Sequence, residues 1–387
     1  MIKIMIIVSG AANRNPFFIM LNDQIEPKTF NMRHKYGILF SVVCITFLLC
    51  SIQGFSQSSE LFNSDQLLEI TLNGDVAGLM KDRGENPQYH EFKLSYKDSN
   101  SALIELPVQI KARGHFRKLK ENCNYPPLLL NFSKETSKNS IFSEQDKVKL
   151  VTPCKDEKYV VREYLVYKMH NLLTPKSFKA RLVKFDLVSN DPKSKDILPL
   201  YGILLEEEDQ MAKRNDAVIV EGKMIKPGQT QKDDFLNMAV FEYLIGNTDW
   251  SVQYYQNVKL IASDSLSIPS TVPYDFDHAG IVGAPYAQPA QELMLSSTRE
   301  RRYRGYCIKD MTQFDAVLSK YNQLKDNFYK VYTDNKLLEE SYLKSTVKFL
   351  DDFYKTINDP KKLKSDFQYP CQADGTGNVV IQGLKKN

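Results

Sequence analysis

The stretch that most constrains the fold of this 387-residue chain lies between residues 235 and 280. Its apolar residues first recur at helical spacing, which predicts an amphipathic helix that Gly246 and Asn247 end. The β-branched segment at residues 257–261 follows and predicts a short strand, and a second acidic turn comes after it. The expected layout is therefore helix, polar loop, strand and acidic loop.

The polar residues of these two loops match the requirements of phosphoryl transfer. In that chemistry one Asp orients the attacking hydroxyl, an Asn helps to hold a metal, and a second Asp joins the metal to the phosphates. The template assigns Asp249 as the catalytic base. It assigns Asn257 and Asp275 as metal ligands, with Asp277 as a further ligand, and Mg²⁺ suits such oxygen donors. The alternative is that both loops are simple turns.

Residues 1–56 have the pattern of a targeting region. From Met32 a short basic segment leads into an uncharged run at residues 36–52, and small polar residues follow. This predicts a secretory signal with its start at Met32 and cleavage near residues 56/57. A retained membrane anchor is the alternative, because the run spans a bilayer only with its flanking residues. We expect an exported protein, periplasmic or extracellular, and leave residues 1–56 out of the fold.

Four cysteines remain after residue 56, namely Cys123, Cys154, Cys307 and Cys371. Cysteines of an exported chain can pair, and four of them allow three connectivities. Proximity in the chain favours Cys123–Cys154 and Cys307–Cys371. A zinc site is not expected, since no two of these cysteines have ligand spacing.

Net charge limits the partners. The whole chain carries +4, and removal of the signal region lowers this to about +1. A nucleic-acid-binding protein needs a basic footprint, so we expect no nucleic-acid partner. We also expect no membrane association after signal removal. The expected partner is a protein substrate or a component of the cell envelope.

The remaining sequence divides into a β-rich N-terminal lobe, 57–210, a mainly helical C-terminal lobe, 211–370, and a flexible tail, 371–387. Alternating or β-branched segments predict strands in the first lobe, interrupted by one helix at residues 159–173. The second lobe contains a short strand at 217–221 and a long helical pattern at 310–353. The predicted strands of the first lobe are 67–72, 91–96, 102–112, 126–132, 147–154, 178–188 and 199–205.

Five further residues are candidates for nucleotide binding. Arg113 precedes a Gly that lets the backbone approach a phosphate, although a solvated basic hairpin is equally consistent. Lys149 on a strand and Glu163 on the next helix match the kinase pair in which the lysine grips phosphates. Glu208 belongs to a run of four acidic residues, 206–209, whose alternative role is a solvated helix start. Lys223 is a spare phosphate-binding candidate.

Four arginines between residues 299 and 304 follow the acidic loops. They either meet an anionic substrate or stabilise the helical region that follows.

With these residues in view, the chain resembles the spore-coat protein H (CotH)-like family of atypical, often secreted kinases. The matching segments are Arg113-Gly114, Lys149 to Arg162, Gly202 to Glu208, Asn247 to Asn257, and Asp275 to Asp277. The resemblance implies an α+β, two-lobed protein-kinase-like fold, ATP with Mg²⁺ or Mn²⁺, and phosphorylation of a protein outside the cytoplasm. It also implies that Asp249 is the catalytic residue and that Asn257 and Asp275 are metal ligands.

Two departures from the family pattern stand out. Asn124-Tyr125-Pro126-Pro127 replaces the lysines that enter a strand in the family, and proline carries no charge. Asp249 and Asn257 are also further apart than in the protein-kinase catalytic loop. Three functions remain open: an atypical kinase, a non-catalytic scaffold or binding protein of the cell envelope, and a metal-dependent hydrolase that uses Asp249, Asp275 and Asp277.

Overall fold

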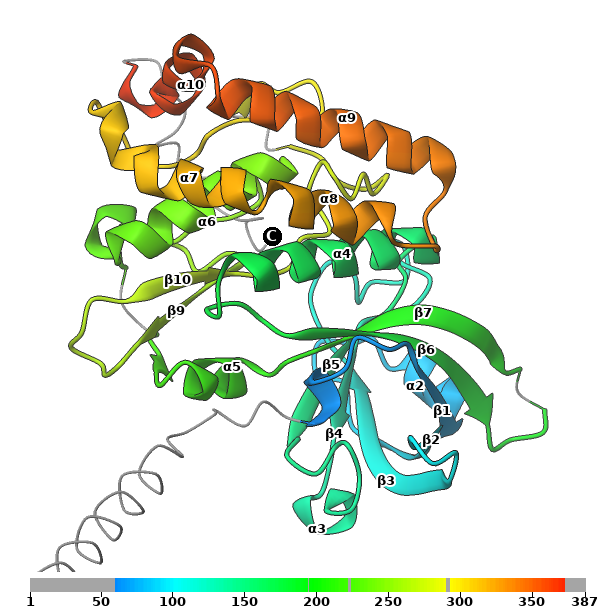
Figure 1. The fold of residues 1–387 in the computed structure, drawn as a ribbon. Coiled ribbons are helices and arrows are strands. Elements are labelled where there is room, and N and C mark those ends of the chain that lie inside the picture. Colours follow the sequence, from blue (N-terminus) through cyan, green and yellow to red (C-terminus); the bar gives the residue numbers. More distant parts are fainter. Residues whose placement is uncertain (1–59, 194, 222–223, 290–292, 373–387) are drawn as a thin grey trace, which may run out of the picture. The chain divides into compact units, whose positions relative to one another are not determined.

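The computed structural model describes residues 60–193, 195–221, 224–289 and 293–372 (Figure 1). The chain separates into the units Met1–Phe55 and Ser56–Asn387, and the description below concerns the second. The predicted signal region, Lys223 and most of the predicted tail lie outside the described residues. Within those ranges, no helix combines the length and apolar character needed to cross a bilayer.

Seven strands of the N-terminal part form a closed barrel, in the order β1-β2-β3-β4-β5-β7-β6. Neighbouring strands are antiparallel, except that β1 and β6 pair in parallel and so close the barrel. Alternate side chains point inward and form one apolar core, as the period of two predicts. The strands are β1 (Leu68–Gly74), β2 (His90–Lys97), β3 (Leu103–Ala112), β4 (Leu128–Asn131), β5 (Lys147–Val151), β6 (Ala180–Ser189) and β7 (Ile197–Leu205).

Three short elements accompany the barrel: η1 (Glu60–Phe62), α2 (Val76–Lys81) and α3 (Lys134–Ser137). The predicted N-terminal strands are confirmed, but β4 is shorter than expected. Its predicted range begins with Pro126 and Pro127, which have no backbone N–H to donate to a ladder.

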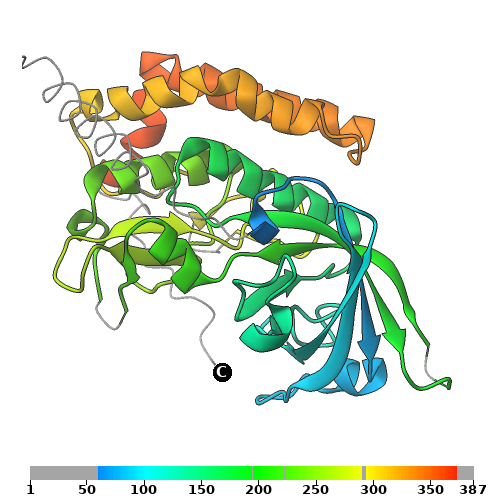
Figure 2. The ribbon, with the colours of Figure 1, turned by 60° about the horizontal axis from the view of Figure 1, so that its bottom comes forward.

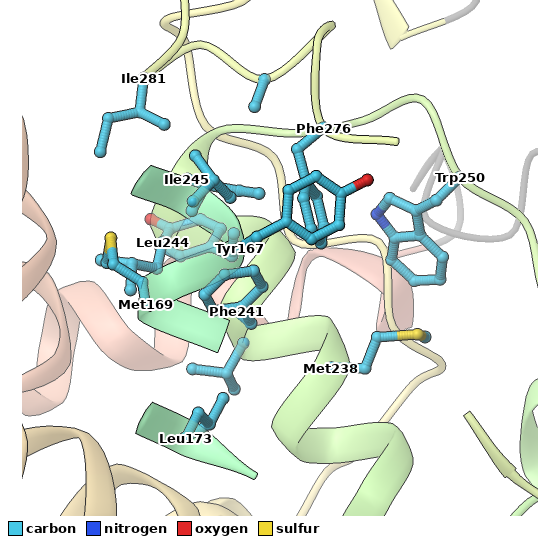
Figure 3. Packing of buried hydrophobic residues seen from close by; sticks show 14 of the residues in the cluster. Tyr167, Met169, Leu173, Met238, Phe241, Leu244, Ile245, Trp250, Phe276 and Ile281 are labelled. Atoms are coloured by element: carbon cyan, nitrogen blue, oxygen red, sulfur yellow. The ribbon is translucent and has the colours of Figure 1, made fainter. Parts of the chain in front are cut away.

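The helix α4 (Glu157–Leu173) joins the barrel to the helical part of the chain. Asp156 caps its first turn by accepting a hydrogen bond from the Lys158 backbone N–H. The helix packs against β6 and β7 on one side and α8 on the other, so most of its side chains are buried. Figure 3 shows Tyr167 of α4 beside Phe241 of α6, with Phe276 from the predicted acidic loop next to them.

A three-stranded sheet, β10-β9-β8, carries the two predicted acidic loops. Its strands are β8 (Val218–Ile219), β9 (Val258–Ala262) and β10 (Ser270–Pro273), with α5 (Glu208–Arg214), η2 (Pro227–Gln229) and α6 (Lys232–Ile245) around them. In the antiparallel β9–β10 pair, Val258 lies opposite Pro273. The residue that precedes β9 and the residues that follow β10 therefore meet at one end of the ribbon.

The C-terminal helices form a layer over α4 and α6 (Figures 1 and 2). The single helical pattern predicted at 310–353 is divided into η4 (Met311–Phe314), α7 (Asp315–Gln323), α8 (Lys325–Thr333) and α9 (Glu340–Ile357). α10 (Pro360–Phe367) and η5 (Tyr369–Cys371) follow. A strand-rich N-terminal part and a helical C-terminal part thus agree with the predicted α+β class.

Both predicted disulfides are confirmed. Cys123 is bonded to Cys154 and Cys307 to Cys371.

Candidate functional site

The predicted catalytic loop follows the left-handed end of α6, where Gly246 has φ 69°. The Asn257 side-chain amide donates to the Asp249 carboxylate at 3.0 Å and to the Asp249 backbone oxygen at 2.7 Å. The Gln256 side-chain amide donates to the second carboxylate oxygen of Asp249. Both oxygens of the predicted base are therefore held by amides from the end of its own loop.

Asp275 lies at the same end of the β9–β10 ribbon as Asn257. The Tyr274 backbone N–H donates to the Asn257 backbone oxygen at 3.0 Å. The Asp275 backbone N–H donates to the Tyr167 hydroxyl at 2.9 Å, which ties the loop to α4. Asn257 and Asp275 have φ 52° and 62°, a left-handed conformation that Asn and Asp tolerate better than most residues.

Burial shifts the pKa values of both aspartates upward, and the charges around them modify these shifts. Burial raises the pKa of Asp249, and His278 opposes the rise. Burial and the neighbouring charge of Asp277 raise the pKa of Asp275 to about 6, against the effect of Arg117. Buried carboxylates that share a site hold protons more strongly because their charges repel each other.

Arg117 links two of the predicted site residues through one of its guanidinium nitrogens. Its guanidinium lies 3.8 Å from the Glu163 carboxylate and 3.6 Å from the Asp277 carboxylate. The Tyr286 hydroxyl also donates to Asp277, at 3.0 Å. Burial and the nearby Asp277 raise the pKa of Glu163 well above its ordinary value, although Arg117 counteracts this.

Lys149 takes part in a different ion pair from the one that the sequence predicts. Its ammonium lies 3.7 Å from Glu208, which also pairs with Lys259 at 2.7 Å. Burial and the charge of Arg113 lower the pKa of Lys149. The expected Lys149–Glu163 pair is thus replaced by Lys149–Glu208 and Arg117–Glu163, because α4 turns Glu163 toward the loop after β3.

The predicted site residues in the described part of the chain gather into neighbouring groups. Asp249 contacts Asn257, Glu163 and Asp277 share Arg117, and Lys149 contacts Glu208. Arg113 acts electrostatically on both Lys149 and Asp275. Lys223 lies outside the described residues.

Sequence reasoning missed residues that complete these groups. Arg117 stood in the basic segment after β3, but nothing in the local pattern distinguished it from its basic neighbours. Lys259 lies two positions after Asn257, and this proximity to a predicted ligand was the available signal. The other residues that were missed are Gln256, His278 and Tyr286.

The four arginines at 299–304 make contacts that stabilise the fold around the site, which agrees with the structural one of the two predicted roles. Arg301 donates to the backbone oxygens of Tyr243 and Leu244 at the end of α6. Arg304 donates to the backbone oxygens of Thr248 and Trp250, the residues on either side of Asp249. Arg299 donates to Gly280, and Arg302 stacks on Tyr369.

Glu206 and Glu207 are structural members of the acidic run. Arg214 donates to both carboxylate oxygens of Glu206, at 2.9 Å each. Glu207 caps α5 by accepting from the Asp209 backbone N–H. Glu208 alone of this run faces the candidate site, through Lys149 and Lys259.

Two of the predicted metal ligands, Asn257 and Asp275, carry oxygen atoms of the kind that a hard divalent metal prefers. Asn257 uses its amide nitrogen to bind Asp249, which leaves its amide oxygen as the atom that could bind a metal, and Asp275 lies at the same end of the β9–β10 ribbon. Asp277 is already held by Arg117 and Tyr286, so Asp275 is the better ligand. No three Asp, Glu, His or Cys side chains of the described residues converge as a metal site, so Asp249, Asp275 and Asp277 do not form one.

Two cavities lie at different distances from these groups. A small one of about 250 Å³ is next to the charged cluster and is lined by Ile219, Val220, Glu221, Tyr255 and Lys259. A larger one of about 990 Å³ lies along the barrel, with Glu69, Lys97 and Lys184 among its lining residues. The larger cavity shares no residue with the aspartate loops, so its size does not make it the candidate site.

No protein-family model matches the chain, and no curated protein matches it. Among solved structures, the chain is similar to the proinflammatory kinase CtkA of Helicobacter pylori, with a TM-score of 0.36 and 12% sequence identity. The match covers 63% of this chain and 90% of that chain. A similarity this distant assigns neither a family nor a function.

Proposed function

We propose that the protein is an exported, CotH-like atypical kinase that transfers a phosphoryl group from ATP to a hydroxyl of a protein substrate, with Mg²⁺ or Mn²⁺. One observation supports this most directly: Asp249 is hydrogen-bonded to Asn257, and Asn257 shares one end of a β-ribbon with Asp275. These are the base and the two oxygen ligands of phosphoryl transfer, in the required order.

In this reaction, side chains of the described residues accept the proton of the substrate hydroxyl and offset the negative charge of the phosphates. The substrate hydroxyl oxygen forms a bond to the terminal phosphorus of ATP while the bond to ADP breaks, and the hydroxyl proton passes to Asp249. The raised pKa of Asp249 favours this proton transfer. The metal, held by Asn257 and Asp275, would supply positive charge to the phosphates. Lys149 and Lys259 add positive charge on the adjacent side.

Two disulfides support the export part of the proposal. Cys123–Cys154 and Cys307–Cys371 both form, and such bonds persist in oxidising compartments.

One observation favours the alternative, a non-catalytic kinase-like binding protein of the cell envelope. The cavity beside Lys259 has about 250 Å³. Pockets for small molecules usually occupy roughly 300–1,000 Å³, so the volume of this cavity lies below that range and is small for a nucleotide.

The deciding measurement is the melting temperature of the purified protein with ATP and Mg²⁺ or Mn²⁺. A ligand that binds only the folded protein adds about 2.7 kcal/mol of stability at a hundred times its dissociation constant. We expect a metal-dependent increase for the wild type that Asp275→Ala abolishes. Asp326→Ala is the matched control, because Asp326 is exposed on α8, and it should keep the increase.

A companion variant separates binding from chemistry. Asp249→Asn should keep the ATP-dependent increase in melting temperature but lose phosphate transfer, because it removes the base and leaves Asn257 and Asp275. Turnover unchanged in Asp249→Asn would remove Asp249 from the mechanism. No increase for the wild type at millimolar ATP would favour the binding-protein alternative.

A further inference from the structure

Arg117 occupies a central position among the acidic side chains of the candidate site. Its side chain is only 11% exposed and contacts three separate segments of the chain. These contacts are Glu163 on α4, Asp277 after β10, and the backbone oxygen of Thr152 after β5. These contacts with three segments hold the guanidinium in one position, although the Arg117 side chain is long and flexible.

The charge of Arg117 is stabilised by its acidic neighbours. Burial works to lower the pKa of Arg117, but Tyr286, Asp277 and Glu163 outweigh burial and raise it. The guanidinium is therefore always charged. Arg113 and His278 also oppose the charge of Asp275, so Arg117 is one of several cations that act on this acidic cluster.

Two buried polar atoms of the Arg117–Glu163 pair lack a hydrogen-bond partner among the described residues. These atoms are Arg117 Nε and Glu163 Oε1. A buried donor left without a partner costs about 1–3 kcal/mol, so such atoms require an explanation. An arginine with a free N–H suits a phosphate oxygen, for which its planar fork is well shaped.

The lysine that the kinase template suggests is engaged elsewhere. Lys149 pairs with Glu208 and lies 5.9 Å from the centre of the Tyr274 ring. In protein kinases, the lysine that pairs with the helix glutamate contacts the phosphates. In this chain that pairing belongs to Arg117 and Glu163.

We propose that Arg117, rather than Lys149, is the side chain that binds the phosphate groups of the nucleotide, with Glu163 as its positioning residue. This inference rests on the proposed function and adds a residue to it. The loop after β3, and not a barrel strand, then supplies the main phosphate contact.

The segment that carries Arg117 is fastened at several points, which suits a binding residue. The Cys123–Cys154 disulfide joins its end to the segment before α4, and the Asn124 backbone N–H donates to the Cys154 oxygen at 2.9 Å. Arg83 donates to the backbone oxygens of Cys123 and Asn124, at 3.0 and 2.7 Å. A group fixed in advance loses less entropy when its ligand binds.

The test compares binding of Mg²⁺–ATP and of adenosine by calorimetry in Arg117→Gln, Arg117→Lys and Lys149→Gln. We expect Arg117→Gln to weaken ATP binding about tenfold or more, the loss of one charge-assisted contact, and to leave adenosine binding unchanged. Arg117→Lys should restore part of the ATP affinity. Lys120→Gln, an exposed change in the same segment, should bind like the wild type.

Each outcome decides between the proposals. ATP affinity that falls in Lys149→Gln and survives in Arg117→Gln overturns this inference and leaves the proposed function in place. A wild type that binds no ATP overturns both. If Arg117→Gln does not fold, Glu163→Gln tests the same pair: unchanged ATP affinity in that variant contradicts the inference.

Discussion

His170 is a buried histidine whose charge state couples the fold to pH. It lies on α4, 2% exposed, with its ring centre 4.7 Å from that of Phe241 and 6.2 Å from that of Phe276. Burial, helped by the charge of Lys320, lowers its pKa to about 3. Its Nδ1 atom has no hydrogen-bond partner among the described residues. The folded protein therefore holds this imidazole in its neutral form.

We predict that His170→Leu weakens the loss of stability on acidification. The His170 pKa is about 6.5 in the unfolded chain and about 3 in the folded chain, so between these pH values only the unfolded chain binds this proton. The unfolded state then binds more protons, so the free energy of unfolding decreases as pH decreases through this window, by about 1.4 kcal/mol per pH unit. Urea unfolding from pH 7 to 4 measures this slope, which should be shallower in His170→Leu.

The matched control for His170 is His115→Gln, which changes an exposed histidine. Its pH dependence should equal that of the wild type. Equal slopes in wild type and His170→Leu would show that burial of His170 is not linked to pH.

At the scale of single elements, the end of α6 positions the predicted catalytic loop. Gly246 is the left-handed residue there, and its backbone N–H donates back to Tyr243. A Cβ at this position would lie 3.0 Å from Phe349 Cζ and 3.1 Å from the Thr298 oxygen. Both the backbone conformation and the neighbouring atoms therefore require glycine.

We predict that Gly246→Ala lowers the free energy of unfolding by about 1–2 kcal/mol or more, from the left-handed conformation and the close contacts. Gly228→Ala is the control, because a Cβ there meets nothing within 4 Å. It should change stability by less than about 0.5 kcal/mol. Denaturant unfolding checks both, and a Gly246→Ala variant as stable as Gly228→Ala would contradict the assigned role.

At the scale of the whole molecule, the two disulfides hold different parts of the chain. Cys123–Cys154 closes a sequence separation of 31 residues near Arg117, and Cys307–Cys371 closes one of 64 residues in the helical part. In the chain-entropy model each bond stabilises the fold by about 4 kcal/mol.

We predict that the paired change Cys123→Ser, Cys154→Ser weakens ATP binding, because it releases the segment that carries Arg117. The matched change Cys307→Ser, Cys371→Ser should lower the melting temperature by a similar amount and keep the ATP-dependent increase. Both variants are measured by thermal unfolding with and without Mg²⁺–ATP. If Mg²⁺–ATP raises the melting temperature of both variants equally, the Cys123–Cys154 disulfide has no role in nucleotide binding.

Local sequence patterns predicted most helices and strands, but not how the strands pair to close the barrel. Alternation in β1 and β6 predicted two strands, yet their parallel pairing joins segments far apart in the sequence. The long pattern at 310–353 predicted one helical region, and its division near Leu324 and after Thr333 depends on packing against α4 and α9. Strand pairing in the barrel joins residues that are far apart in the sequence, so a pattern in a short segment does not predict it.

By itself, the sequence indicated the α+β division, the two disulfide pairings and the placement of Asp249 and Asn257 on one loop, because these depend on periodicity, chain proximity and one short segment. The tertiary structure decided which charges meet. Glu163 pairs with Arg117 and Lys149 with Glu208, since α4 and the segment after β3 come together only when the barrel closes. The energy of an ion pair depends on the distance between its charges, and this distance cannot be predicted from the residue types alone.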